Sequence, residues 1–271
     1  GKRCPVAQVA ADSIDASAFH PTRGDDEFSP FAPIPDAERR ALGALVRPDG
    51  VLEAIGDGQP ASGLEPNGAS LWCRETGWAA GTVMAAGSAD DTAREAHFTL
   101  LFGPSMDYHG HLDHGGLTWF ALGTPVLSDR GLFSKDRGPR FDYAHTMAAH
   151  SVFEPLGSPG YDPDTSATRI SPTEYSLRDA ADGIERLRDV NIGPNRLVVR
   201  DRGTGAKEWI QHWQLAPGWE PTATGAVNAE AGLTLTINCP KLKPVRSTAA
   251  VSLASMAMAS SSAASPPGAA S

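Results

Sequence analysis

The hydrophobic positions of this chain fall into many short runs, and few of these runs are long enough for a packed helix. From about residue 70 onward, β-prone runs are separated by Gly, Pro and Asp residues. We predict strands at residues 77–85, 96–102, 117–122, 125–129, 150–154, 174–178, 184–190, 196–201, 208–215 and 233–238. Many short strands with turn signals between them predict an all-β fold, an antiparallel β-sandwich or barrel. The absence of alternating strand and helix patterns argues against a parallel sheet.

Two segments of different character flank this β-rich part. Residues 1–36 are polar and Pro-rich, and Asp36 then caps a predicted helix that ends near Val46. Residues 247–271 contain nine Ala, eight Ser and no charge, which predicts a disordered tail, with an apolar helix near 251–258 as the alternative. We therefore divide the chain into a linker with a short helix (1–69), a sandwich domain (70–246) and a tail (247–271). The chain does not begin with Met, so we expect a fragment or a processed chain.

Composition narrows the classes of function. The chain has 271 residues, of which 41% are hydrophobic, so it can bury a sizeable core. Its net charge is −9 and it has no basic run, which argues against a nucleic-acid partner. No apolar stretch reaches the length of about 18 residues that a membrane helix needs, so no membrane partner is expected. Three widely spaced Cys residues predict neither a disulfide framework nor a zinc ribbon, and they leave the compartment open.

The residues that can carry chemistry are concentrated between positions 97 and 150, where six of the eight His residues lie. The densest part is the segment 108–116, Tyr-His-Gly-His-Leu-Asp-His-Gly-Gly. In an extended chain alternate side chains share one face, so His109, His111 and Asp113 would point the same way. Imidazole and carboxylate groups together suit a zinc ion. This segment therefore predicts a metal site.

Two families share such a string of residues. The segment from His109 to His114, followed by two glycines, resembles the metal-binding loop of the metallo-β-lactamase-fold hydrolases. In that family an Asp-x-Gly turn precedes the His loop, whereas here Asp129-Arg130-Gly131 follows it. The αββα fold of those hydrolases also needs regular helices, and few are predicted after residue 114. This hydrolase interpretation stays open as an alternative.

The longer pattern resembles the C-terminal β-sheet domain of the heparinase II/III-like polysaccharide lyases, which include alginate lyases. The resemblance rests on an ordered set of segments, and Ser151 stands where those lyases usually have Asn. The segments are His97–Pro104, the His-x-His-x-Asp of 109–113, Leu117–Gly123, Val126–Gly131, Tyr143–Val152, Leu197–Asp201 and His212–Gly218. With 46–57 upstream, the resemblance covers roughly residues 46–240. It implies a sandwich of the super-sandwich type, preceded by the end of a helical domain.

The resemblance also implies an activity and a set of site residues. The activity is β-elimination on an acidic polysaccharide or oligosaccharide that contains uronic acid. His109 would face the sugar and Tyr143 would act as the acid or base. His111, Asp129 and His150 would bind a structural zinc ion. Apart from the resemblance, Arg140 belongs with Arg130 and Arg137 to a local basic group, and we predict that Arg140 binds substrate through its guanidinium.

Members of that family carry a helical α/α-toroid before the sandwich, and this chain holds at most its last helix. The resemblance therefore implies a toroid partner domain in the parent protein, without which the sandwich lacks part of the sugar cleft. A second alternative follows from the missing toroid, namely a non-catalytic carbohydrate-binding or docking sandwich. Localisation stays unknown; it would be secreted or periplasmic if the parent protein carries a signal peptide.

Overall fold

The computed structural model describes residues 43–236, except residues 57, 59, 67–69, 74–76, 85–94, 105–109, 132–136 and 159. Most of the helix predicted between Asp36 and Val46 lies outside the described residues, and so does the tail predicted at 247–271. Within the described part, no helix has the length and apolar character that a membrane crossing requires.

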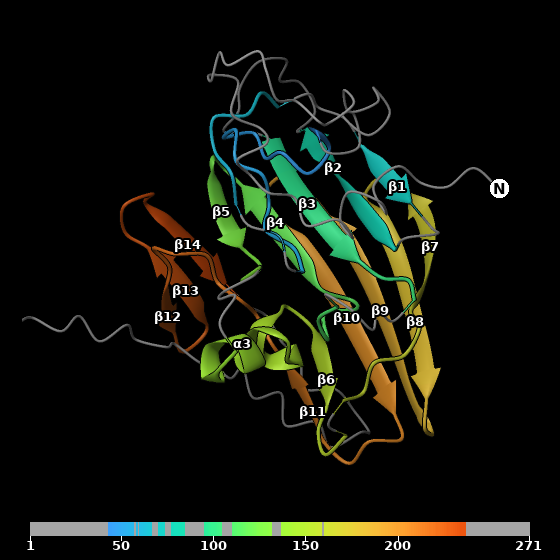
Figure 1. The fold of residues 1–271 in the computed structure, drawn as a ribbon. Helices are drawn as coiled ribbons and strands as arrows, with labels where there is room; N and C mark the ends of the chain where they lie inside the picture. The colour runs from blue at the N-terminus through green and yellow to red at the C-terminus, as the bar shows by residue number, and fades with distance from the viewer. Residues whose placement is uncertain are drawn as a thin grey trace, which may run out of the picture.

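Two antiparallel sheets form the body of the fold (Figure 1). The first sheet has five strands in sequential order: β1 (Leu71–Cys73), β2 (Trp78–Met84), β3 (Glu95–Leu101), β4 (Leu117–Ala121) and β5 (Thr124–Leu127). The second sheet has four strands in the order β10-β9-β8-β7: β7 (Ser166–Ser171), β8 (Glu174–Ala181), β9 (Ile184–Ile192) and β10 (Leu197–Thr204). Because each strand pairs with the strand next to it in sequence, both sheets are meanders.

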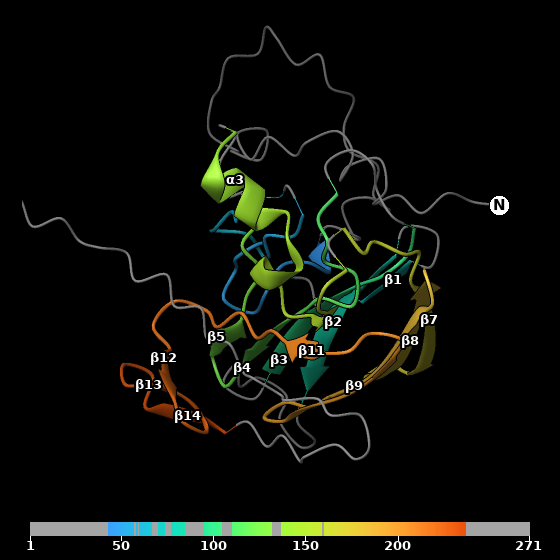
Figure 2. The same cartoon turned by 90° about the horizontal axis from the view of Figure 1, so that it is seen from below.

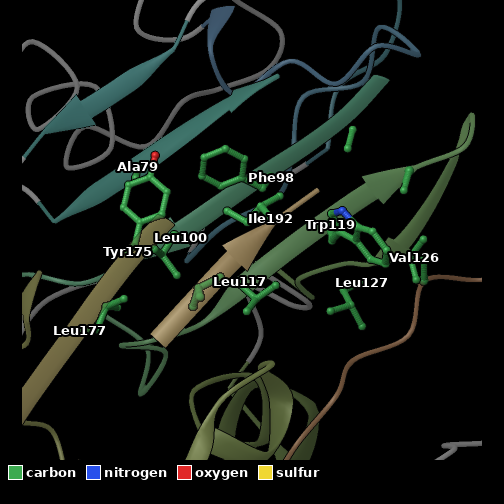
Figure 3. Packing of buried hydrophobic residues seen from close by; sticks show 14 of the residues in the cluster. Ala79, Phe98, Leu100, Leu117, Trp119, Val126, Leu127, Tyr175, Leu177 and Ile192 are labelled. Carbon is green, nitrogen blue, oxygen red and sulfur yellow. The ribbon is translucent and has the colours of Figure 1, made fainter. Parts of the chain in front are cut away.

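The main hydrophobic core lies between the two sheets. Side chains of β3 and β4 face side chains of β8 and β9, as Figure 3 shows for Phe98, Leu100, Leu117, Trp119, Tyr175, Leu177 and Ile192. All of these are buried, Leu100 to 1% exposure and Tyr175 and Leu177 to 2%. Burying each such side chain contributes about 1.5–3 kcal/mol to folding. The predicted all-β, antiparallel sandwich is therefore confirmed.

The first sheet is also covered on its outer face, by residues 43–64 of the chain. Leu45, Val46, Leu52 and Ile55 form a second core with side chains of this sheet. His97 of β3 donates a hydrogen bond from Nε2 to the Ala44 carbonyl, 2.8 Å away. Burial lowers the pKa of His97 to about 4. His97 therefore ties the covering segment to the sheet as a neutral imidazole.

The remaining elements lie outside the two main sheets. Helix α3 (Pro139–Ala144) and the 3-10 turn η3 (Met147–Ala149) lead into β6 (Phe153–Pro155), which pairs with β11 (Trp209–Gln211). A separate three-stranded sheet holds β12 (Glu220–Thr222), β13 (Gly225–Asn228) and β14 (Leu233–Thr236). In Figure 2, α3 and this small sheet lie on opposite sides of β5. The segments around α3, η3 and β6 are those that carry the candidate site.

Candidate functional site

A tight loop before β4 carries the central part of the His-rich segment. Gly115 donates its backbone N–H to the Leu101 carbonyl, and Gly116 donates to the Asp113 carbonyl at 2.7 Å. A Cβ atom at position 116 would lie 2.5 Å from that same carbonyl oxygen. Only Gly fits there, and its lack of a Cβ atom allows the loop to turn sharply before it enters β4.

The loop brings His111 and Asp113 next to His150, which follows η3. All three side chains are buried, and one ligand atom from each lies within 4.8 Å of the other two. Among the described residues this is the group of His and Asp side chains that could hold a metal ion. His111 and His150 thus lie close together although 39 positions of sequence separate them, and both side chains project from loops rather than from strands.

His150 also contacts the predicted ligand Asp129, which follows β5. Nδ1 of His150 lies 2.7 Å from Oδ2 of Asp129, and Nε2 lies 2.9 Å from the Ala144 carbonyl oxygen. The other carboxylate oxygen of Asp129 accepts a hydrogen bond from the Gly131 N–H at 2.9 Å. His150 therefore stands between two carboxylates, Asp113 and Asp129, and a backbone carbonyl.

Burial and charge act against each other in this cluster. Burial alone disfavours the imidazolium of His150, but the carboxylates of Asp129 and Asp113 outweigh it and raise the pKa to about 9. Burial likewise opposes the ionised form of Asp129, yet His150 holds the pKa of that carboxyl below its usual value. Asp113 is different, because burial prevails over the attraction of His150 and raises its pKa to about 6.

The donor set fits a divalent metal ion. Two imidazoles and a carboxylate are ligands that zinc takes in proteins. Ligand atoms of a tetrahedral zinc ion lie about 3.3 Å apart, because each bond is about 2.0–2.1 Å long. Nδ1 of His150 and Oδ2 of Asp129, now 2.7 Å apart, would therefore have to move only slightly further apart to bind the same zinc ion. In the described structure both ring nitrogens of His150 face acceptors. Metal binding therefore requires that His150 release a proton.

Tyr143, the predicted acid or base, lies in α3. Its side chain is half-buried, and its hydroxyl donates to the Ala148 carbonyl oxygen at 3.0 Å. Gln214 donates to the same oxygen at 2.7 Å. In this conformation the hydroxyl fastens α3 to η3.

The two remaining predicted site residues are His109 and Arg140. His109 lies outside the described residues. Arg140 lies in α3 and is exposed, as are Arg130 and Arg137. The guanidinium of Arg137 lies over the Phe141 ring, 5.6 Å from its centre. All three basic side chains are thus exposed, and Arg137 and Arg140 lie at the start of α3.

Sequence reasoning gave no role to two residues that border the cluster. His145 donates from Nδ1 to the Phe141 carbonyl, and its ring centre lies 4.2 Å from that of His111. Glu53 is buried beside Arg47, and burial, only partly opposed by Arg47, raises its pKa to about 7. The negative charge of Asp129 adds to this rise. A lone Glu in a loop carries no sequence signal for such a position.

The hydrolase alternative required His114 and Asp113 in a metal centre within an αββα fold. In the described part of the chain, α3 and η3 are the defined helices, and the sheets form a sandwich. His114 donates from Nδ1 to the Pro163 carbonyl at 3.0 Å and lies 3.7 Å from Asp162. The described fold and the position of His114 do not support the hydrolase interpretation.

No protein-family model matches the chain, and no curated protein matches it. Solved structures do match. A heparan sulfate lyase mutant from Pedobacter heparinus superposes with a TM-score of 0.55 and 15% identity, over 70% of this chain and 36% of that one. A heparinase III gene product gives a TM-score of 0.51 and 12% identity, over 63% of this chain and 32% of that one. The chain has a heparinase-like fold.

This heparinase-like fold was the one that the sequence segments implied. The chain spans about a third of the length of these two structures. At such low identity the likeness concerns the fold, and it assigns no function to a single side chain.

Proposed function

We propose that this chain is the sandwich domain of a polysaccharide lyase that cleaves acidic glycans containing uronic acid by β-elimination. The observation that carries the proposal is the coincidence of two independent features. The fold is similar to that of a heparan sulfate lyase and a heparinase III. Of the segments that resemble the lyase motifs, His111 and Asp113 from one and His150 from another meet in one buried cluster.

The proposed reaction needs a base, an acid and a group that neutralises the uronate. A base removes the proton on the carbon next to the carboxylate, and an acid protonates the departing glycosidic oxygen. That carbon acid is weak, so the negative charge that develops on the carboxylate must be stabilised. We assign His109 to the sugar-facing position and Tyr143 to the acid or base. To act as an acid, Tyr143 must exchange its hydrogen bond to Ala148 for one to the sugar.

We propose that Arg140 binds the acidic glycan. Its side chain is exposed at the start of α3, near the exposed Arg137, in an otherwise acidic protein. A guanidinium pairs with a carboxylate or a sulfate through two parallel hydrogen bonds. The helical toroid domain of a longer parent protein would supply the other wall of the cleft.

We propose that His111, Asp129 and His150 hold a structural zinc ion. The ion would tie together the loop before β4, the end of β5 and the segment after η3. Asp113 is the competing carboxylate, because it lies within 4.8 Å of both imidazoles. Removal of either carboxylate, as Asp129→Asn or Asp113→Asn, separates these assignments when the zinc content of each purified variant is measured. Loss of zinc in the Asp113 variant alone would transfer the ligand role to Asp113.

The activity is tested by incubating the chain, and a longer protein that contains it, with heparan sulfate, alginate and related polymers. Elimination creates a double bond conjugated to the uronate carboxylate, which absorbs in the ultraviolet. We expect a rise in absorbance for the longer protein and its loss in a His109→Ala variant of that protein. Binding without any product, for both proteins and all polymers, would favour the non-catalytic carbohydrate-binding sandwich and would overturn the lyase proposal.

A further inference from the structure

Strand β9 places two charged side chains where a sandwich normally buries apolar ones. Its residues alternate between buried and partly exposed positions along the whole strand. The inward positions are Ile184, Arg186, Arg188, Val190 and Ile192. Arg186 is 5% exposed and Arg188 is 4% exposed. Two neighbouring inward positions of one strand thus hold buried guanidinium groups.

The guanidinium of Arg186 donates to one carboxylate and to two backbone carbonyls. Its Nε and Nη2 atoms donate to the carboxylate of Asp179 at 2.9 and 2.7 Å. Its remaining donors reach backbone carbonyls, with Nη1 3.0 Å from the Phe153 oxygen and Nη2 3.4 Å from the His114 oxygen. The guanidinium also lies against the Tyr161 ring, 5.1 Å from its centre.

Arg188, at the next inward position of β9, repeats this arrangement. Its Nε and Nη2 atoms donate to the carboxylate of Asp201 at 2.7 and 3.0 Å. Its Nη1 atom donates to two carbonyl oxygens, those of Gly115 at 2.5 Å and Ser151 at 2.8 Å. A further bond runs from Nη2 to Gln211 at 2.8 Å.

The carbonyls that the two arginines bind belong to only two segments, which are the segments that carry the His and Asp cluster. Arg186 joins His114 to Phe153, and Arg188 joins Gly115 to Ser151. These four residues adjoin His111 and Asp113 on one side and His150 on the other. Each guanidinium therefore spans the same two segments from the sheet beneath them.

We propose that Arg186 and Arg188 are positioning residues that fix the loop 111–115 and the segment 150–153 at the separation that the cluster needs. A buried ion pair stabilises a fold little more than a well-packed apolar pair does, so stability alone does not explain two of them. Guanidinium has five donors in a planar fork, which can bind a carboxylate and two carbonyls at once. Lysine, with a single nitrogen, cannot reach all these acceptors.

The positioning of the two segments stands on these contacts, and only its consequence for zinc rests on the proposed function. The test uses the full chain and the variants Arg186→Lys and Arg188→Lys. Arg178→Lys and Arg202→Lys are matched controls, because these side chains form ion pairs on the same sheet but are 65% and 63% exposed.

Hydrogen exchange followed by mass spectrometry is the first readout. The N–H groups of Leu112, Gly115, Gly116 and His150 donate to backbone carbonyls, so they report on the two segments. We expect exchange in peptides that begin upstream of, and span, residues 110–116 and 150–153 to rise at least about tenfold in each buried-arginine variant, because those segments open locally. Exchange in the β2–β3 pair should stay unchanged, and the control variants should match the wild type.

The second readout is zinc affinity by chelator competition, which we expect to fall at least about tenfold in the two buried-arginine variants and to stay constant in the controls. A uniform rise of exchange across the sandwich, or no rise in the two peptides, would overturn the positioning role. Absence of zinc binding in the wild type would overturn the zinc proposal and leave the exchange test decisive. If a lysine variant does not fold, Asp201→Asn replaces it, and the same local pattern is expected at smaller amplitude.

Discussion

The ion pair of His150 and Asp129 predicts how the stability of the metal-free protein depends on pH. The pKa of His150 is raised from 6.5 to about 9 in the folded chain, so protonation stabilises the fold. This contribution is fully present below the unfolded pKa of 6.5 and is lost as pH rises through about 9. Between about pH 7.5 and about pH 9.5 the loss amounts to roughly 2 kcal/mol of unfolding free energy.

Other buried groups titrate outside this window. Glu53 and Asp113 have raised pKa values of about 7 and about 6, so the stability that comes from their protonated carboxyls is lost as pH rises through these values. Most of that loss is complete before the alkaline window is reached. The pKa of His97 is lowered to about 4, so its contribution is lost only as pH falls below its unfolded value of 6.5. The slope in the alkaline window therefore reports mainly on His150.

The assay is urea unfolding of chelator-treated protein, followed by circular dichroism at several pH values across the window. Asp129→Asn is the matched variant, because it removes the negative charge and keeps a side chain of the same shape. We expect the wild type to lose stability with rising pH and the variant to lose much less. A flat or rising profile in the wild type, or an equal slope in the variant, would refute the reasoning about this pair.

Two further predictions concern single side chains. Tyr143→Phe removes the hydroxyl that donates to the Ala148 carbonyl, so thermal unfolding should show a loss of about 1 kcal/mol of stability. Turnover of the longer protein should be lost as well, and retained turnover would mean that Tyr143 has only a structural role. Gly203→Ala would place a Cβ atom 2.3 Å from the Trp209 ring, which should cost about 1–3 kcal/mol of stability by overpacking. Gly138→Ala is its control, because an added Cβ there meets no atom within 4 Å, and equal unfolding midpoints for the two variants would contradict the packing argument.

Much of the sandwich could be predicted from the sequence, because most strands carry β-prone, largely apolar residues between clear turn signals. The predicted segments 174–178, 184–190 and 196–201 correspond to β8, β9 and β10. Strand β7 was missed because Ala167 is its one buried residue, so it has no apolar pattern. Strand β12, Glu220–Thr222, was missed for the same reason, since all its residues are exposed.

The site was predictable only in part. The nearness of His111 and His150 followed from the resemblance, because local spacing says nothing about residues so far apart. The helix that carries Tyr143 was not predicted, since the six residues of α3 are too few to show helical periodicity and include two aromatic side chains. Arg186 and Arg188 gave no signal, because charged residues in a strand are ordinarily solvent-facing. Their buried role depends on carbonyl groups that only the folded chain brings near.

The measurement that tests the lyase proposal most directly is the mass of the cleaved glycan formed in water enriched in oxygen-18. Elimination breaks the glycosidic bond without adding water, so the products carry an unsaturated uronate and no label. Hydrolysis adds one labelled water molecule per bond cleaved. We predict unlabelled, unsaturated oligosaccharides from heparan sulfate or another uronate polymer incubated with the longer protein. Labelled, saturated products would contradict β-elimination and restore a hydrolase as the better account.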